Sequence, residues 1–238
     1  AFAQALRAGR SQEVARLILT ASGGPFRGRV RGELVNVTPQ EAMAHPTWNM
    51  GRVITINSAT LVNKGLELIE AALLYRVTLD DIVVTVHPQS VVHSMVEFSD
   101  GSTIAQASPP DMRLPIGLAL TWPDRLPAAA APCDWTRPSS WTFEPLDDAT
   151  FPAVELARRA GKAAGTAPAV YNAANEVLVD AFCESRIGFL KITDLIAQCL
   201  DEHLGIGHVP DTELTLEAVL AADAAARERA RELVEELS

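Results

Sequence analysis

The residues best suited to chemistry lie in one short segment, residues 57–70, which reads NSATLVNKGLELIE. Its apolar spacing predicts one helix over residues 57–75 with Ser58 at the N-terminus. Asn63 and Lys64 project from the first turns, where residues three or four apart are neighbours. Free N–H groups at a helix N-terminus, a hydroxyl, an amide and an ammonium make a competent phosphate site.

Two carboxylates on the same helix indicate a cation. Glu67 shares a face with Asn63 and Lys64, and Glu70 lies one turn further on. A carboxylate repels a phosphate, so Glu67 must serve either Lys64 or a divalent metal, which prefers oxygen ligands. The alternative is that Ser58 only caps the helix while Lys64 and Glu67 form a surface ion pair. The segment alone leaves both interpretations open.

Two further strings, TASGGPF and AHPTWNMG, carry polar and aromatic residues at chain turns. Ser22 and the two glycines after it can turn backbone N–H groups inward as an anion nest, although most such strings are only turns. His45, Trp48 and Met50 lie between a proline and a glycine. They suit either a loop whose indole fills the core or a lid that excludes water and presents an imidazole to a polar substrate.

The elements around these residues predict an α/β (α+β) fold with a small mixed sheet. Strands are expected at residues 16–21 and 81–87, which are apolar runs ended by turn residues. Residues 94–107 alternate on both sides of an Asp-Gly pair, which predicts a hairpin with a type I′ turn. The helix over residues 57–75 should bury Val62, Leu66, Ile69 and Leu73.

The second half of the sequence changes character twice. Residues 121–150 contain repeated prolines and three tryptophans and predict a stiff linker that wraps over a neighbouring surface. Residues 151–238 read as four helices separated by glycines, a small bundle. We therefore expect a catalytic α/β domain at 1–120, a linker at 121–150 and a C-terminal helical bundle at 151–238.

Composition excludes several classes of function. The formal net charge of −10 argues against nucleic-acid binding, which needs clustered Lys and Arg. No apolar run reaches the length of a membrane span and no secretory signal is recognisable, so a cytoplasmic protein is expected. The cysteines, Cys133, Cys183 and Cys199, lack CxxC spacing and are expected to be free thiols. The start without methionine, already in a helical pattern, suggests a chain entered in its middle.

Five strings in order resemble one enzyme family. They are TASGGPFRG, HPTWNMG, NSATLVNKGLELIE, VHPQSVVHSMVEFSDGSTIAQASPPDMRLPI and GTAPAVYNAANE. Together they are similar to 1-deoxy-D-xylulose 5-phosphate reductoisomerases, the NADPH- and metal-dependent enzymes of the non-mevalonate isoprenoid pathway. The resemblance runs from the first residue into the helical region.

The resemblance implies roles for the polar segment. Ser22, Ser58, Asn63 and Lys64 match residues that bind the substrate phosphate in this family, in agreement with the anion site inferred above. Glu67 matches a ligand of the Mg²⁺ or Mn²⁺ ion. Many members have an aspartate in the position of Asn57, and little effect is expected because an amide also caps a helix.

The resemblance also implies a mobile flap. His45, Trp48 and Met50 match the segment that closes over the substrate, with His45 touching the substrate as a catalytic residue and Met50 as a candidate contact of the nucleotide. His87 and His93 lie in the HPQSVVH string and are interpreted as structural residues.

The family reaction converts 1-deoxy-D-xylulose 5-phosphate to 2-C-methyl-D-erythritol 4-phosphate by isomerisation and reduction with NADPH. Family members begin with a dinucleotide-binding domain of roughly 150 residues and an Asp-Ser-Glu segment that supplies two further metal ligands. This sequence contains neither, and no GxGxxG fingerprint. The polypeptide alone is therefore expected to be inactive, with the NADPH site mostly in the missing domain.

Three functional interpretations follow. The first is a fragment of an active reductoisomerase that forms a homodimer through its sheet region, with the hairpin near Asp100 as a candidate edge. The second is a shortened relative that acts as a phosphate-binding or regulatory module. The third is a helical interaction protein in which the bundle after Phe151 is the working part.

Overall fold

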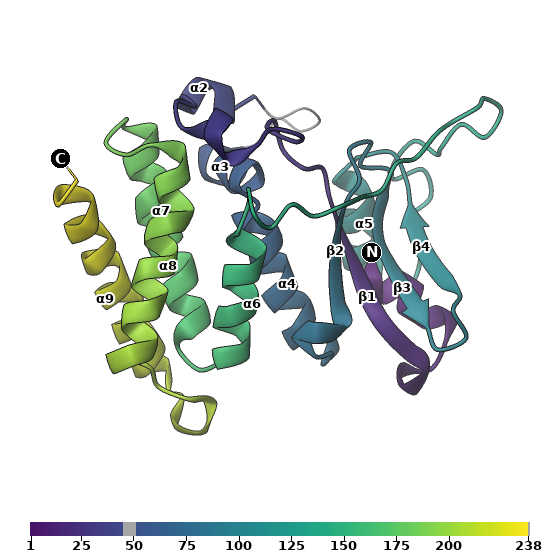
Figure 1. Cartoon of the computed structure of the whole chain (residues 1–238). Coiled ribbons are helices and arrows are strands. Elements are labelled where there is room, and N and C mark those ends of the chain that lie inside the picture. The colour runs from purple at the N-terminus through teal and green to yellow at the C-terminus, as the bar shows by residue number, and fades with distance from the viewer. Residues whose placement is uncertain (45–50, 238) are drawn as a thin grey trace. The chain divides into compact units, whose positions relative to one another are not determined.

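The computed structural model describes residues 1–44 and 51–237 (Figure 1). They form two compact units that interleave along the sequence. The sheet unit comprises residues 1–22 and 80–146, and the helical unit comprises residues 23–79 and 147–238. The chain thus passes between the two units three times, after residues 22, 79 and 146, whereas the domains expected from the sequence follow one another. The functional assignment of those domains remains a prediction.

The sheet unit is built on five strands in the order β4-β3-β1-β2-β5. Strands β1 and β2 are parallel and the other pairs are antiparallel, which confirms the mixed sheet. Side chains of β3 alternate strictly between buried and half-buried, because successive residues of a strand point to opposite faces. The bounds of the strands are β1 Val14–Ala21, β2 Ile82–Val86, β3 Val92–Phe98, β4 Thr103–Ala107 and β5 Glu144–Pro145.

The hairpin between β3 and β4 is confirmed, but its turn differs from the expected type. Gly101 N–H donates to the Phe98 carbonyl at 2.9 Å, and the positive φ of this turn (+86°) belongs to Gly101 and not to Asp100. This is a type I turn followed by a left-handed glycine. The Asp100 carboxylate instead accepts hydrogen bonds from the backbone N–H and hydroxyl of Ser102.

Short helices and a long irregular segment complete the sheet unit. The helices are α1 Phe2–Ala5, η1 Leu6–Ala8, η2 Ser11–Glu13, η4 Leu79–Asp81 and α5 Arg113–Thr121. The segment between α5 and β5 contains Trp135, which is 71% exposed and packs edge-on against Trp141 at 5.8 Å. The indoles therefore pack against each other and only partly against the rest of the unit.

The helical unit has an alanine-rich core centred on α7. Within the described residues, four α-helices follow residue 151, as predicted. Helix α7 packs against α8 and α9 (Figure 1). Its Tyr171, Leu178 and Phe182 are fully buried. The elements are η3 Arg31–Leu34, α2 Pro39–Ala42, α3 Arg52–Thr60, α4 Val62–Tyr75, α6 Ala153–Ala163, α7 Ala167–Cys183, α8 Phe189–Ile206, η5 Asp211–Glu213 and α9 Leu216–Glu235.

Two expectations about the whole chain can be compared with the structure. All three cysteines are free thiols, as predicted. Among the residues that the structure describes, every helix is too short or too polar to cross a bilayer.

Candidate functional site

The polar segment is divided between two helices. Leu61 adopts a left-handed conformation (φ 65°, ψ 11°) that ends α3 and begins α4. The prediction of one helix starting at Ser58 is therefore wrong, and Ser58 lies in the last turn of α3. Leu61 is only 4% exposed, so the spacing of buried apolar residues continues across the boundary between the two helices. Hydrophobic spacing cannot reveal a single left-handed residue whose side chain stays in the core.

The buried face of α4 also differs from the expectation. Leu73 is 74% exposed, whereas Gly65 is buried. A Cβ at Gly65 would lie 2.6 Å from the Tyr171 hydroxyl and 2.7 Å from the Ala157 Cβ. The glycine in the NKGLE string thus lets the start of α4 approach α6 and α7 more closely than any side chain would allow.

Three predicted site residues meet on the exposed side of this first turn. The Asn63 amide Nδ2 donates to Glu67 Oε1 at 2.7 Å, and Lys64 Nζ donates to Glu67 Oε2 at 2.6 Å. The Lys64 side chain is 13% exposed and that of Glu67 is 35% exposed. The prediction that these side chains are neighbours is confirmed, and the cluster, named here the α4 polar cluster, is partly shielded from water.

The glycine turn after β1 approaches Ser58. Gly24 has a positive φ of 67°, and a Cβ there would lie 2.8 Å from the Ser58 carbonyl oxygen and 3.1 Å from the Ala59 Cα. The TASGGPF string therefore needs its second glycine for a close backbone contact within the helical unit. Ser22 follows the last residue of β1 directly and belongs to the sheet unit. Its role in anion binding stays a prediction.

The predicted flap cannot be compared with the structure. His45, Trp48 and Met50 lie outside the described residues. In the helix that follows, Arg52 at the start of α3 forms a solvent-exposed ion pair with Asp180 of α7 at 2.6 Å.

His87 has a structural role that its sequence context only partly indicated. Its ring is fully buried and its Nε2 accepts hydrogen bonds from the backbone N–H groups of Val91 and Val92, both at 3.1 Å. Nε2 is therefore unprotonated, and Nδ1–H donates to the Thr142 carbonyl at 2.9 Å. The ring also stacks on Phe143 with centroids 4.6 Å apart.

These contacts hold the irregular segment onto the sheet. Gln89 exchanges two hydrogen bonds with Thr142, and the Thr85 hydroxyl donates to the Glu144 carbonyl. The tryptophans and prolines of residues 121–150 predicted a segment that wraps over a neighbouring surface. They did not predict that His87 anchors it. His93 makes a simpler contact, from Nε2 to the Ser108 carbonyl at 3.0 Å.

A divalent cation would find one suitable ligand in the α4 polar cluster. Carboxylate oxygen is the donor that Mg²⁺ and Mn²⁺ favour, and Glu67 is half-buried and ordered by two donors. No group of three His, Cys, Asp or Glu side chains with metal-site geometry occurs in the described part of the chain. Glu67 is therefore a carboxylate that could serve as one ligand of such an ion.

Two buried amides of the helical unit could not be identified from the sequence. Among the residues that the structure describes, the Asn57 Oδ1, one residue before Ser58, is buried and has no hydrogen-bond partner. Both amide atoms of Asn175 in α7 are buried and unpartnered as well. Nothing in their sequence context distinguishes them from ordinary capped or solvated amides.

Comparison with known proteins gives one consistent match. Two family models match, one described as "DXP reductoisomerase C-terminal domain" over residues 107–229 and one as "1-deoxy-D-xylulose 5-phosphate reductoisomerase C-terminal domain" over residues 1–75. The chain is 72% identical to the 1-deoxy-D-xylulose 5-phosphate reductoisomerase of Cutibacterium acnes, over 98% of this chain and 59% of that protein. It is 63% identical to the one of Beutenbergia cavernae, with the same coverage.

Solved structures agree with the sequence relatives. The 1-deoxy-D-xylulose 5-phosphate reductoisomerase of Zymomonas mobilis, in complex with NADPH, matches with a TM-score of 0.88 and 45% identity, over 99% of this chain and 59% of that one. A DOX-P reductoisomerase in complex with NADPH, fosmidomycin and magnesium matches with a TM-score of 0.89 and 38% identity, over 95% of this chain and 57% of that one. The chain thus spans about three fifths of these relatives, and it belongs to the DXP reductoisomerase family.

Proposed function

We propose that the chain is the phosphate-binding and C-terminal part of a 1-deoxy-D-xylulose 5-phosphate reductoisomerase. The reaction is the NADPH- and metal-dependent isomerisation and reduction of this sugar phosphate to 2-C-methyl-D-erythritol 4-phosphate. The observation that carries the proposal is the α4 polar cluster, in which Asn63, Lys64 and Glu67 converge at the start of one helix. The 72% identity to a reductoisomerase supports it.

The substrate phosphate is bound by Ser22, Ser58, Asn63 and Lys64 in this proposal. Lys64 supplies the charge and the amide of Asn63 a directed hydrogen bond, and both lie at the positive end of the α4 helix dipole. Binding the phosphate at a distance from the reacting carbons contributes orientation and lowers the entropic part of the barrier.

Glu67 supplies one ligand to a Mg²⁺ or Mn²⁺ ion, and further carboxylates come from residues outside this sequence. A solved relative carries magnesium together with fosmidomycin and NADPH, which supports a shared metal site. When bound, such an ion polarises carbonyl and hydroxyl oxygens and stabilises negative charge that develops on them. The sequence has no GxGxxG fingerprint, so we propose that NADPH is held mainly by residues beyond these 238.

The flap residues have proposed roles that rest on the family resemblance. His45 contacts the substrate and is the candidate catalytic residue, while Trp48 covers the substrate. Met50 is a candidate contact of the nicotinamide cofactor. A lid of this composition excludes water from the reacting groups and thereby strengthens the electrostatic interactions around them.

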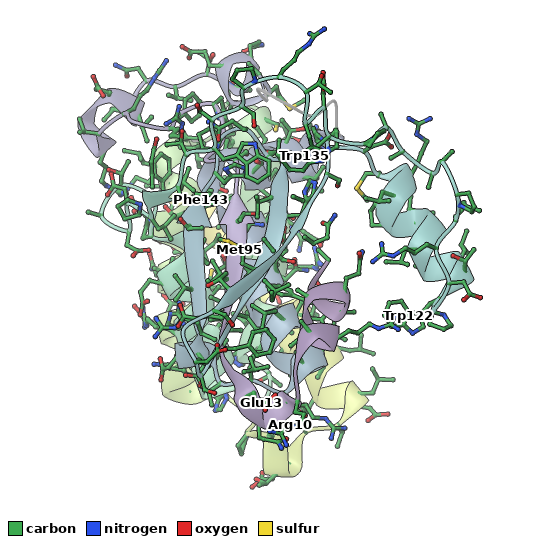
Figure 2. The ribbon with its side chains drawn as sticks, turned by 90° about the vertical axis from the view of Figure 1, so that its right-hand side faces the viewer. Arg10, Glu13, Met95, Trp122, Trp135 and Phe143 are labelled. Atoms are coloured by element: carbon green, nitrogen blue, oxygen red, sulfur yellow. The ribbon has the colours of Figure 1, made fainter. Side chains whose placement is uncertain are left out.

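The partner in the assembly is a second copy of the chain, bound through the sheet unit. One face of the sheet carries Val83, Ile18 and Met95 in register across three neighbouring strands. Figure 2 looks onto this face, with Met95 near its middle and Phe143 above it. A hollow of about 250 Å³ lies there, lined by Arg16, Ile18, Val83, Thr85, Met95, Glu97 and Phe143. A cytoplasmic location completes the proposal.

Binding of the sugar phosphate to the 238-residue chain tests the site. Lys64→Met should abolish binding of 1-deoxy-D-xylulose 5-phosphate measured by calorimetry, because the phosphate loses its main charge. Lys191→Met removes the same charge from an exposed position on α8 and should leave binding unchanged. Equal effects of both substitutions would contradict the proposed site. The chain alone should not oxidise NADPH with this substrate, and measurable turnover would show that the missing residues are dispensable.

A further inference from the structure

We infer that Glu67 competes with the phosphate for Lys64 and Asn63, so that anion binding at the α4 polar cluster depends on whatever neutralises Glu67. The inference rests on the proposed phosphate site and adds a coupling to it. Glu67 then has two functions: it is a metal ligand, and it is the internal counter-ion of the phosphate-binding lysine.

The geometry of the cluster supports this competition. Each oxygen of the Glu67 carboxylate accepts from a different group, Oε1 from the Asn63 amide at 2.7 Å and Oε2 from Lys64 Nζ at 2.6 Å. Charge-assisted hydrogen bonds of this length are among the stronger ones. The two side chains proposed to grip the phosphate are therefore already engaged by one carboxylate.

Shielding makes the competition larger than on an open surface. Lys64 is 13% exposed, so water screens its charge only in part. Within the described residues Glu67 is the acid that lies within ion-pair distance of this lysine. A phosphate that enters must break or share both contacts and leaves a carboxylate without its counter-charge beside a new anion.

A divalent cation held by Glu67 would neutralise the carboxylate, and Lys64 and Asn63 would then be available to the anion. The cation and the phosphate therefore bind with positive coupling, and the coupling is reciprocal by thermodynamic linkage. This coupling requires no movement of one helix against another, because Asn63, Lys64 and Glu67 all lie within two turns of α4.

The test is a titration of the 238-residue chain with inorganic phosphate in the presence of a metal chelator, followed by NMR or calorimetry. Glu67→Gln keeps the size and shape of the side chain but removes its charge. It should tighten phosphate binding by about fivefold to thirtyfold, the factor expected when one or two kcal/mol of competition are lost. Glu67→Ala is a second variant that α4 tolerates, since alanine has the highest helix propensity.

Two controls separate the possible outcomes. Glu70→Gln removes the same charge from an exposed position one turn further along α4 and should change phosphate affinity by less than about twofold. Equal tightening by Glu67→Gln and Glu70→Gln, or no tightening by either Glu67 variant, would overturn the inference. Lys64→Met examines the proposed site itself: binding that survives this substitution rejects the site, whereas binding that is lost while Glu67→Gln has no effect rejects only the competition.

Discussion

The α4 polar cluster and the His87 anchor are both polar, and they use their hydrogen bonds differently. In the cluster, three side chains satisfy one another at the edge of the helical unit. At His87, in the sheet unit, the ring is fully buried and both nitrogens are occupied by backbone groups. Side-chain contacts at a partly exposed site can be exchanged for a ligand, whereas backbone contacts in a core cannot be released without unfolding. Proximity of polar residues in the sequence does not distinguish the two cases.

Replacing His87 should have the largest effect on stability and would show how much the buried histidine contributes. His87→Ala takes the acceptor away from the buried N–H of Val92 and the half-buried N–H of Val91, and it removes the anchor of Thr142. We expect a loss of about 3–5 kcal/mol in the free energy of unfolding. Chemical denaturation measures it. His93→Ala, which removes a half-buried ring whose Nε2 contacts the Ser108 carbonyl, is the control on strand β3 and should cost less.

A side chain at position 65 should disturb the support of the polar cluster. Gly65→Ala places a Cβ 2.7 Å from that of Ala157 and 2.6 Å from the Tyr171 hydroxyl, so α4 must shift away from α6 and α7. We expect a destabilisation of about 1–3 kcal/mol, typical of overpacked cores. Gly32→Ala, at a position with open space around it, is the control. A Gly65 variant as stable as this control would show that the helices adjust without cost.

A third polar site, around His203, gives an intermediate case that depends on pH. Thr166 Oγ1 accepts from the Val209 N–H at 3.1 Å and lies 2.8 Å from His203 Nε2, so the hydroxyl and the ring share a hydrogen bond. Burial, and then the neighbouring His208, lower the pKa of His203 below 6.5. The unfolded chain therefore takes up this proton first as pH falls.

The stability that His203 contributes should be complete above about pH 6.5. It should decrease as the pH falls from there toward the lower pKa of the folded state. Thermal unfolding of the chain and of His203→Gln over this pH range measures the contribution. Equal pH dependence of the two proteins would assign the effect to other groups.

Lys64→Met should have the smallest effect on stability, and it examines the α4 polar cluster in the same way as His87→Ala examines the His87 anchor. The Lys64–Glu67 pair is within one helix and partly solvated, so its loss should change the free energy of unfolding by about 1 kcal/mol or less. Phosphate binding should be lost in the same variant. A stability loss as large as that of His87→Ala would mean that the cluster is structural.

Much of the local structure followed from the sequence. The apolar runs at β1 and β2, the Asp-Gly hairpin and the four helices after residue 151 were predicted because they depend on side-chain periodicity and turn residues that act locally. The spacing of Asn63, Lys64 and Glu67 also sufficed to bring them together, since residues three and four apart on a helix always lie on one face.

Tertiary structure decided the remaining features. Leu61 adopts the left-handed conformation that divides the predicted helix. Gly65 is buried against α6 and α7, and His87 holds Thr142, so both contacts depend on elements far away in the chain. The interleaved units have the same origin, because strands pair and helices pack according to the total apolar surface they bury and not according to their order in the sequence. By itself, the sequence determined which polar groups could meet on one helix. Only the packed structure decided which of them are occupied by the backbone and which remain available to a ligand.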